Sequence, residues 1–198
     1  MDWYGEPETP PVQVREVGSI EQKGWRSTWV GLMVLNGTTY LETAAHIFPD
    51  APALDQVPLE RLFTRAYVVD IPSGSQELPA PDCALDGFEP DCDSLLLSLG
   101  WETALRRPMC YKESPYFSPE LQEWILQYRP VMLGADTLSF DHPADTSMPF
   151  VRALFEQGAM ILAPLVGLAQ LPRPTVHLCA APLKLPGASA APCRVFAW

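Results

Sequence analysis

The sequence predicts an α/β domain in which short, buried strands alternate with helices. Two runs, residues 66–71 (AYVVDI) and 95–99 (LLLSL), are almost entirely apolar, which is typical of strands buried on both faces. Residues 119–128 (PELQEWILQY) instead repeat their apolar side chains with the period of a helix. Because 198 residues are enough for one domain of this layered kind, we expect residues 1–198 to form a single domain with buried sheet layers and flanking helices.

The other elements follow in chain order. The acidic, proline-rich start predicts an extended lead-in over residues 1–23, and β-branched and aromatic side chains predict a strand over residues 27–35. Ser118 can cap the helix of residues 119–128, and a second helix is predicted over residues 149–157, ending at Gly158. Further strands are predicted at residues 131–134, 160–162, 176–180 and 194–198.

Charge argues against two classes of partner. The formal net charge is -11, and no run of basic residues is longer than two. Nucleic acids and anionic membrane surfaces are bound through basic patches, so neither is an expected partner. The sequence also has no apolar run long enough to span a bilayer and no signal peptide, so we expect a cytoplasmic location.

The cysteines argue against a disulfide framework or a structural zinc site. There are five of them, an odd number, and no two are spaced as CxxC. The acidic residues of the proline-rich stretch 72–93 predict a solvated surface.

The candidate site is the stretch of residues 34–49, VLNGTTYLETAAHIFP, which follows an apolar run. It places Asn36, Tyr40, Glu42 and His46 at a fixed spacing, N-x3-Y-x-E-x3-H. A turn-forming glycine, Gly37, just after a buried strand would present these side chains at the edge of a sheet.

Five separated segments of the chain resemble the cyclase superfamily in order and spacing. That superfamily includes bacterial kynurenine formamidase, isatin hydrolase and aromatic-polyketide ring cyclases. The segments are PLERLFTRAYVVDI, SLLLSLGW, YFSPELQEWILQ, GADTLSFD and APLKLPGASAAPCRVFAW. The resemblance implies the cyclase/arylformamidase fold, a small-molecule substrate and a homodimer or higher homo-oligomer.

The superfamily's signature, H-x-G-T-H-x-D-x-P-x-H, binds zinc or manganese. In its register Asn36 and Tyr40 replace two histidines, Glu42 replaces the aspartate, Ala44 replaces the proline, and His46 keeps the last histidine.

Two further positions of the family's site are also replaced. A catalytic histidine at the start of a helix corresponds to Val151, and a metal-binding glutamate on a strand corresponds to Ala163. A catalytic zinc needs about three protein ligands, so we expect no catalytic cofactor. Any zinc or manganese would be held by Asn36, Glu42 and His46.

Two interpretations of the retained residues stay open. In one, His46 is a general base or acid, Glu42 is its partner, and Tyr40 polarises a substrate carbonyl. In the other, the three are remnants, with His46 satisfied by backbone carbonyls and Glu42 paired to Arg152 or another arginine. His142 is either a proton carrier at the pocket rim or an exposed loop residue.

Several residues are candidates for binding substrate. Asn36 lies within the motif, and Trp29, Phe48 and Trp101 fall in segments that border the site in the resembling family. Aromatic rings would suit a flat substrate, although tryptophans such as Trp29 also serve as core or interface residues.

The leading hypothesis is a divergent family member that acts on a small cyclic or aromatic metabolite. It would hydrolyse an amide or lactam, or close a ring with loss of water, without a catalytic metal. A pseudoenzyme that only binds a ligand or partner and a weak single-metal hydrolase are the alternatives.

Overall fold

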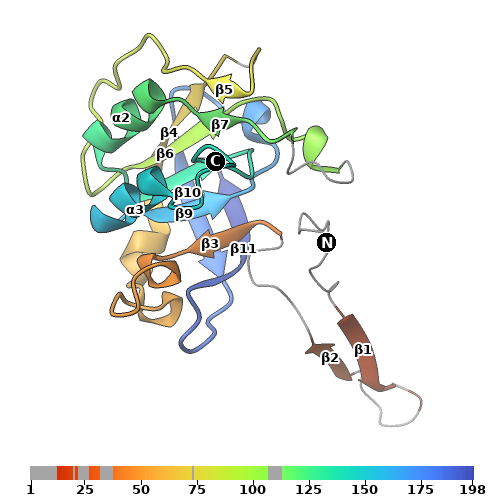
Figure 1. Cartoon of the computed structure of the whole chain (residues 1–198). Helices are drawn as coiled ribbons and strands as arrows, with labels where there is room; N and C mark the ends of the chain where they lie inside the picture. The colour runs from red at the N-terminus through yellow and green to blue at the C-terminus, as the bar shows by residue number, and fades with distance from the viewer. Residues whose placement is uncertain (1–12, 20, 22–26, 32–37, 73, 107–112) are drawn as a thin grey trace.

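The computed structural model describes residues 13–19, 21, 27–31, 38–72, 74–106 and 113–198. Within these residues, a closed β-barrel organises the chain (Figure 1). Around the barrel the strand order is β10–β11–β3–β9–β8–β6–β4. The strands are β3 (Tyr40–Glu42), β4 (Phe63–Asp70), β6 (Ser94–Ser98), β8 (Met132–Ala135), β9 (Met160–Ala163), β10 (Thr175–Pro182) and β11 (Ala190–Ala197).

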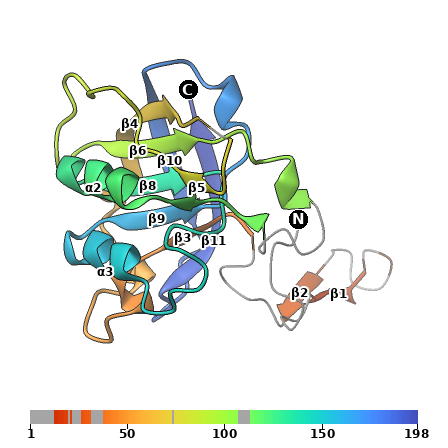
Figure 2. The ribbon, with the colours of Figure 1, turned by 45° about the horizontal axis from the view of Figure 1, so that its top comes forward.

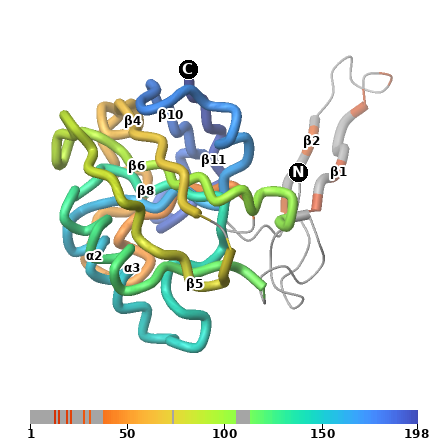
Figure 3. Tube along the Cα trace, turned by 90° about the horizontal axis from the view of Figure 1, so that it is seen from above, coloured from red at the N-terminus to blue at the C-terminus, as the bar shows by residue number. Residues whose placement is uncertain are grey.

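Parallel and antiparallel pairing divide the barrel. Strands β4, β6, β8 and β9 pair in parallel, whereas β3, β10 and β11 join their neighbours antiparallel. Strand β10 closes the barrel because it pairs with both β11 and β4, and Figure 3 shows these three strands side by side. The predicted sheet layers are therefore one closed sheet.

The four parallel strands, β4, β6, β8 and β9, are apolar because both of their faces are buried. Ala66 and Val68 of β4 belong to a core to which all seven strands contribute, inside the barrel. Tyr67 and Val69 of the same strand belong to a second core outside the barrel, together with side chains of the helices. This double burial explains the continuous apolar runs from which the strands were predicted.

Two helices cover one side of the barrel in the described residues, α2 (Pro119–Tyr128) and α3 (Pro149–Glu156), as Figure 2 shows. Helix α2 has the predicted bounds, and the Ser118 side chain accepts the Leu121 N–H as its cap. Helix α3 ends one residue earlier than predicted. The two predicted helices are thus present, and both lie against one side of the barrel.

The start of the chain departs from the predicted lead-in. Strand β1 (Gln13–Gly18) pairs antiparallel with β2 (Ser27–Gly31), and in Figures 1 and 2 the pair lies outside the barrel. The predicted strand 27–35 is confirmed over β2, and its later residues fall outside the described part. A short parallel pair, β5 (Glu77–Leu78) and β7 (Tyr116–Phe117), was not predicted.

No helix in the described parts of the chain is long and apolar enough to cross a membrane.

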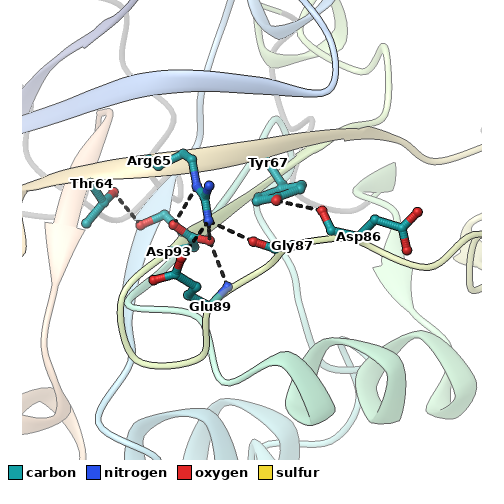
Figure 4. A network of polar contacts seen from close by, with 8 residues as sticks. Thr64, Arg65, Tyr67, Asp86, Gly87, Glu89 and Asp93 are labelled. Carbon is teal, nitrogen blue, oxygen red and sulfur yellow. Dashed lines mark hydrogen bonds and ion pairs between the residues drawn. The ribbon is translucent and has the colours of Figure 1, made fainter.

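One acidic residue of the stretch 72–93 is not on a solvated surface, contrary to the prediction. Asp93 is 4% exposed and accepts two hydrogen bonds from Arg65, at 2.9 and 2.5 Å (Figure 4). It also accepts the Glu89 N–H at 2.8 Å, and Arg65 donates to the Gly87 carbonyl. The pair thereby fastens the acidic loop to strand β4, and charge pairing is what allows the carboxylate to be buried.

We predict that Asp93→Asn lowers the free energy of unfolding by about 2 kcal/mol, because it removes a charge-assisted double hydrogen bond. The matched control is Asp91→Asn, whose carboxylate pairs with Arg129 at 3.0 Å on the exposed surface. Exposed pairs contribute little, so the control should lose less than about 0.5 kcal/mol. Urea denaturation measures both, and equal losses would contradict the role given to Asp93.

Candidate active site

Strand β3 and the turn after it position the three candidate catalytic residues. Leu41 is fully buried in the barrel interior. Because side chains alternate along a strand, Tyr40 and Glu42 point outward, opposite Ala163 and Ile161 of β9. The 3₁₀ helix η1 (Ala44–His46) then brings His46 back over Glu42.

The turn between Glu42 and His46 is fixed by hydrogen bonds. The Thr43 N–H donates to the Ser189 carbonyl at 2.9 Å, and the Thr43 hydroxyl lies 3.2 Å from the carbonyls of Pro52 and Ser189. These bonds hold the chain where strand β3 becomes the 3₁₀ helix. The backbone therefore fixes the positions of Glu42 and His46 relative to each other.

Glu42 and His46 form a close pair. Glu42 Oε1 lies 3.1 Å from His46 Nδ1, and the two side chains are 6% and 38% exposed. The contact lacks the alignment of a hydrogen bond, so Oε1 is buried without a hydrogen-bond donor among the described residues. Catalytic hydrogen bonds often align only when substrate is bound. Among the described residues, the predicted pairing of Glu42 with Arg152 is not found, since Arg152 donates to the Ser147 carbonyl and lies over the Phe48 ring.

Burial sets the protonation of all three residues. It raises the pKa of Glu42 to about 7 and lowers the pKa of His46. Burial, with a smaller effect from the neighbouring Glu42 charge, raises the pKa of Tyr40 above its ordinary value. At neutral pH His46 is therefore a neutral imidazole and Tyr40 a protonated phenol, while Glu42 is close to its midpoint.

Glu42 and His46 line a cavity of about 390 Å³. Its far wall is the loop of residues 138–148 and the first turn of helix α3. Both oxygens of Asp141 accept backbone N–H groups of that turn, from Phe150 at 2.8 Å and Val151 at 3.1 Å. A carboxylate in this position satisfies donors that a helix start leaves open, so the loop and the helix form one rigid wall.

The structure brings the replaced family positions to this site. Val151 lines the cavity, and Ala163 lies directly across from Tyr40 on β9. Two small or apolar side chains therefore stand beside the retained pair.

His142 also lines the cavity, and it is an exposed loop residue. Its role as a proton carrier stays a prediction. Its Nδ1 accepts the Ala144 N–H at 3.1 Å, and its ring meets Tyr116 edge-on with centroids 4.7 Å apart. Asp145 and Met148 line the cavity as well. Neither was predicted, because irregular loop residues carry no periodic signal.

Two of the four predicted substrate-binding residues line other cavities than the pair does. Trp101 lines a second cavity of about 430 Å³ beside Leu78, and Phe48 lines a third, apolar cavity of about 440 Å³. Asn36 lies outside the described residues, as does the side chain of Trp29, whose backbone pairs with Arg15. Substrate binding by these four stays a prediction.

The donor set at the site does not fit a tightly held catalytic metal. Glu42 and His46 are two ligands of the kind zinc prefers, where about three are needed. No group of three histidine, cysteine, aspartate or glutamate side chains in the described ranges could hold an ion. The third candidate, Asn36, is a neutral oxygen donor outside those ranges.

Comparison with known proteins places these features in context. The family model described as "Putative cyclase" matches residues 19–142, more than half of the chain. No curated protein matches the sequence.

Several solved structures share the fold. A predicted metal-dependent hydrolase from Bacillus stearothermophilus is 22% identical over 97% of this chain and 88% of its own, with a TM-score of 0.76. Isatin hydrolase A from Labrenzia aggregata, bound to benzyl benzoate, is 22% identical over 100% and 88%, with a TM-score of 0.75. An isatin hydrolase bound to the product analogue thioisatinate is 18% identical over 96% and 82%, with a TM-score of 0.74. At these identities the likeness shows the fold.

The burial of Glu42 predicts a pH-dependent stability. A pKa raised from 4.5 to about 7 means that the folded state binds the proton more tightly than the unfolded state. Stability is then greatest below pH 4.5 and falls as the pH rises through 7, by about 3 kcal/mol in all. Glu42→Gln does not titrate, so its free energy of unfolding relative to the parent should rise by about 2–3 kcal/mol between pH 5 and pH 8.

Urea denaturation at the two pH values measures this difference. Glu156→Gln, the same change at an exposed residue of α3, controls for the loss of one negative charge. A Glu42→Gln difference that stays constant with pH would show that the carboxylate is compensated in the folded protein.

Proposed function

Because this chain belongs to the cyclase family, we propose that it is a hydrolase or ring-forming enzyme that uses Glu42 and His46 as an acid–base pair. The observation that carries the proposal is the 3.1 Å contact between Glu42 Oε1 and His46 Nδ1 in the wall of a cavity. The pairing leaves the other ring nitrogen, Nε2, available to substrate or water. A neutral imidazole with a carboxylate behind it is a standard arrangement for general-base catalysis.

In the hydrolytic direction, His46 takes a proton from a water molecule that attacks a carbonyl carbon. As the imidazole becomes positively charged, the Glu42 carboxylate stabilises it, and the contact tightens into a charge-assisted hydrogen bond. The imidazolium then returns the proton to the leaving nitrogen. Run in reverse, the same transfers close a ring with loss of water.

Tyr40 has the properties of the group that polarises the carbonyl. Its side chain lines the same cavity, and its raised pKa keeps the phenol protonated at neutral pH. A phenolic O–H directed at the carbonyl oxygen would stabilise the negative charge that develops there.

The cavity supports a small cyclic or aromatic substrate. Its volume of about 390 Å³ falls in the range of small-molecule sites, and apolar walls at Leu138, Val151 and Ile161 suit a flat ring. Two of the similar structures are isatin hydrolases, which supports a cyclic amide as the class to test first.

A binding protein without catalysis is the second candidate. Val151 and Ala163 stand where the family carries a catalytic histidine and a metal ligand, and that double loss is the observation in its favour. A weak single-metal hydrolase would need Asn36 as a third ligand and would show metal-dependent activity. A homo-oligomeric state and a cytoplasmic location stay predictions.

We predict that His46→Ala lowers kcat/KM for a hydrolysed cyclic amide at least about 100-fold, because general-base catalysis contributes that much or more. A panel of aromatic lactams, followed by absorbance, identifies the substrate first. His177→Ala, a change at an exposed histidine of strand β10, should leave the rate unchanged.

The pH profile separates the roles of the pair. In the parent, kcat/KM should rise with a midpoint near pH 7 as Glu42 loses its proton. Glu42→Gln should lower the rate and remove that rise. Full activity of His46→Ala would refute the acid–base pair, whereas activity that requires added zinc or manganese would favour the metal hydrolase.

A further inference from the structure

The least satisfied polar atom at the site is Glu42 Oε1. The Glu42 residue is 5% exposed, lines the cavity and has no hydrogen-bond donor for this oxygen among the described residues. An unpaired carboxylate oxygen in such a place is costly to bury. Buried polar groups in native structures almost always have a hydrogen-bond partner, so an unpaired one indicates a functional role.

We propose that the cavity binds an organic nitrogen cation, of the amidinium or ammonium class, whose N–H group pairs with Glu42 Oε1. As a statement about the substrate, this rests on the function proposed above; as a statement about binding, it stands independently.

The charges around the cavity favour a cation. Its described lining includes three carboxyl groups, Glu42, Asp141 and Asp145, and two histidines, His46 and His142, but no lysine or arginine. The net charge of -11 adds a negative field around the whole molecule. An anionic ligand would be repelled, so a carboxylate is the least suitable head group for this site.

Among the three carboxyl groups, Glu42 is the one with capacity for a buried ligand. Asp141 uses both oxygens to cap helix α3. Asp145 is exposed and accepts the N–H and hydroxyl of Ser147. Glu42 Oε1 has neither kind of donor among the described residues. Because a carboxylate oxygen can accept two hydrogen bonds, His46 and a ligand can both reach it.

The rest of the cavity suits the body of such a ligand. Tyr40, Phe140 and His142 provide aromatic rings, while Met148, Val151 and Ile161 are apolar. Rings attract cations as well as apolar groups. The ligand would thus carry its positive charge at the Glu42 end and a flat or apolar portion toward the loop 138–148.

This proposal also accounts for the misfit of the donor set with a metal ion. In the resembling family a bound cation neutralises the acidic residue of the signature. Here two ligands are too few to hold that ion firmly, so the positive charge would come from the ligand itself.

The test uses three molecules of nearly the same shape, benzamidinium, benzamide and benzoate, which differ in charge. Isothermal titration calorimetry at pH 8, above the pKa of Glu42, measures their affinity for the full chain. We expect benzamidinium to bind at least about tenfold more tightly than benzamide, and benzoate not to bind. Glu42→Gln should weaken benzamidinium binding by about tenfold to a hundredfold, whereas Glu156→Gln should not change it.

Several results would overturn the proposal. These are no benzamidinium binding at concentrations up to roughly 10 mM, equal affinity for benzamide, or equal affinity of the parent and Glu42→Gln. Stoichiometric zinc binding that requires Glu42 and His46 would overturn it too, because a metal ion would then satisfy Oε1. The calorimetry measures binding without turnover. A failure of the cation proposal can therefore be told apart from a failure of the proposed catalysis, which the rate of His46→Ala tests.

Discussion

Burial of the four parallel barrel strands on both faces is the constraint on which the rest of the structure depends. One face of β4, β6, β8 and β9 fills the barrel interior and the other faces the helices, so alternate residues of each of these strands belong to different cores. Elsewhere polar side chains of the barrel strands have polar partners, as Thr64 has Ser94 and Arg65 has Asp93. On strand β3, Leu41 fills the interior while Tyr40 and Glu42 face outward into a cavity. Glu42 is the exception, because its Oε1 is buried without a hydrogen-bond donor among the described residues.

That exception explains the electrostatic character of the site. Glu42 lies on a strand with apolar neighbours, and its carboxylate has little water and no cationic partner in the described residues. The same surroundings disfavour charge on His46, so the two groups compete for protons near neutrality. Pairs whose environments move their pKa values in opposite directions are a recurring feature of acid–base sites.

Local signals made much of the fold predictable. The bounds of helix α2 follow from Ser118, Pro119 and the apolar stripe, all within a dozen residues. Closure of the barrel was not predictable, because β10 pairs with β4 more than a hundred residues earlier and no local pattern encodes that contact. The burial of Asp93 in an ion pair was not predictable either, because its partner Arg65 is distant in the sequence and lies on strand β4.

The residues of the candidate site show the same difference between local patterns and long-range contacts. Glu42 and His46 could be associated from their spacing, because only one turn of chain separates them. The cavities that Phe48 and Trp101 line could not be predicted, because the direction of an aromatic side chain depends on the local backbone conformation. The loop 138–148 is far from Glu42 and His46 in the sequence, and only the tertiary fold brings it to the same cavity.

The double cap of Asp141 on helix α3 has a consequence for how this protein could diversify. Asp141 lines the cavity and also accepts the first N–H groups of helix α3, so its replacement would loosen the start of the helix. The loop that follows Asp141 ends at Pro149, the first residue of the same helix. Changes in ligand preference are thereby confined to the seven positions between these two fixed points, and an engineer who wishes to retarget the cavity would randomise residues 142–148 and leave both anchors intact.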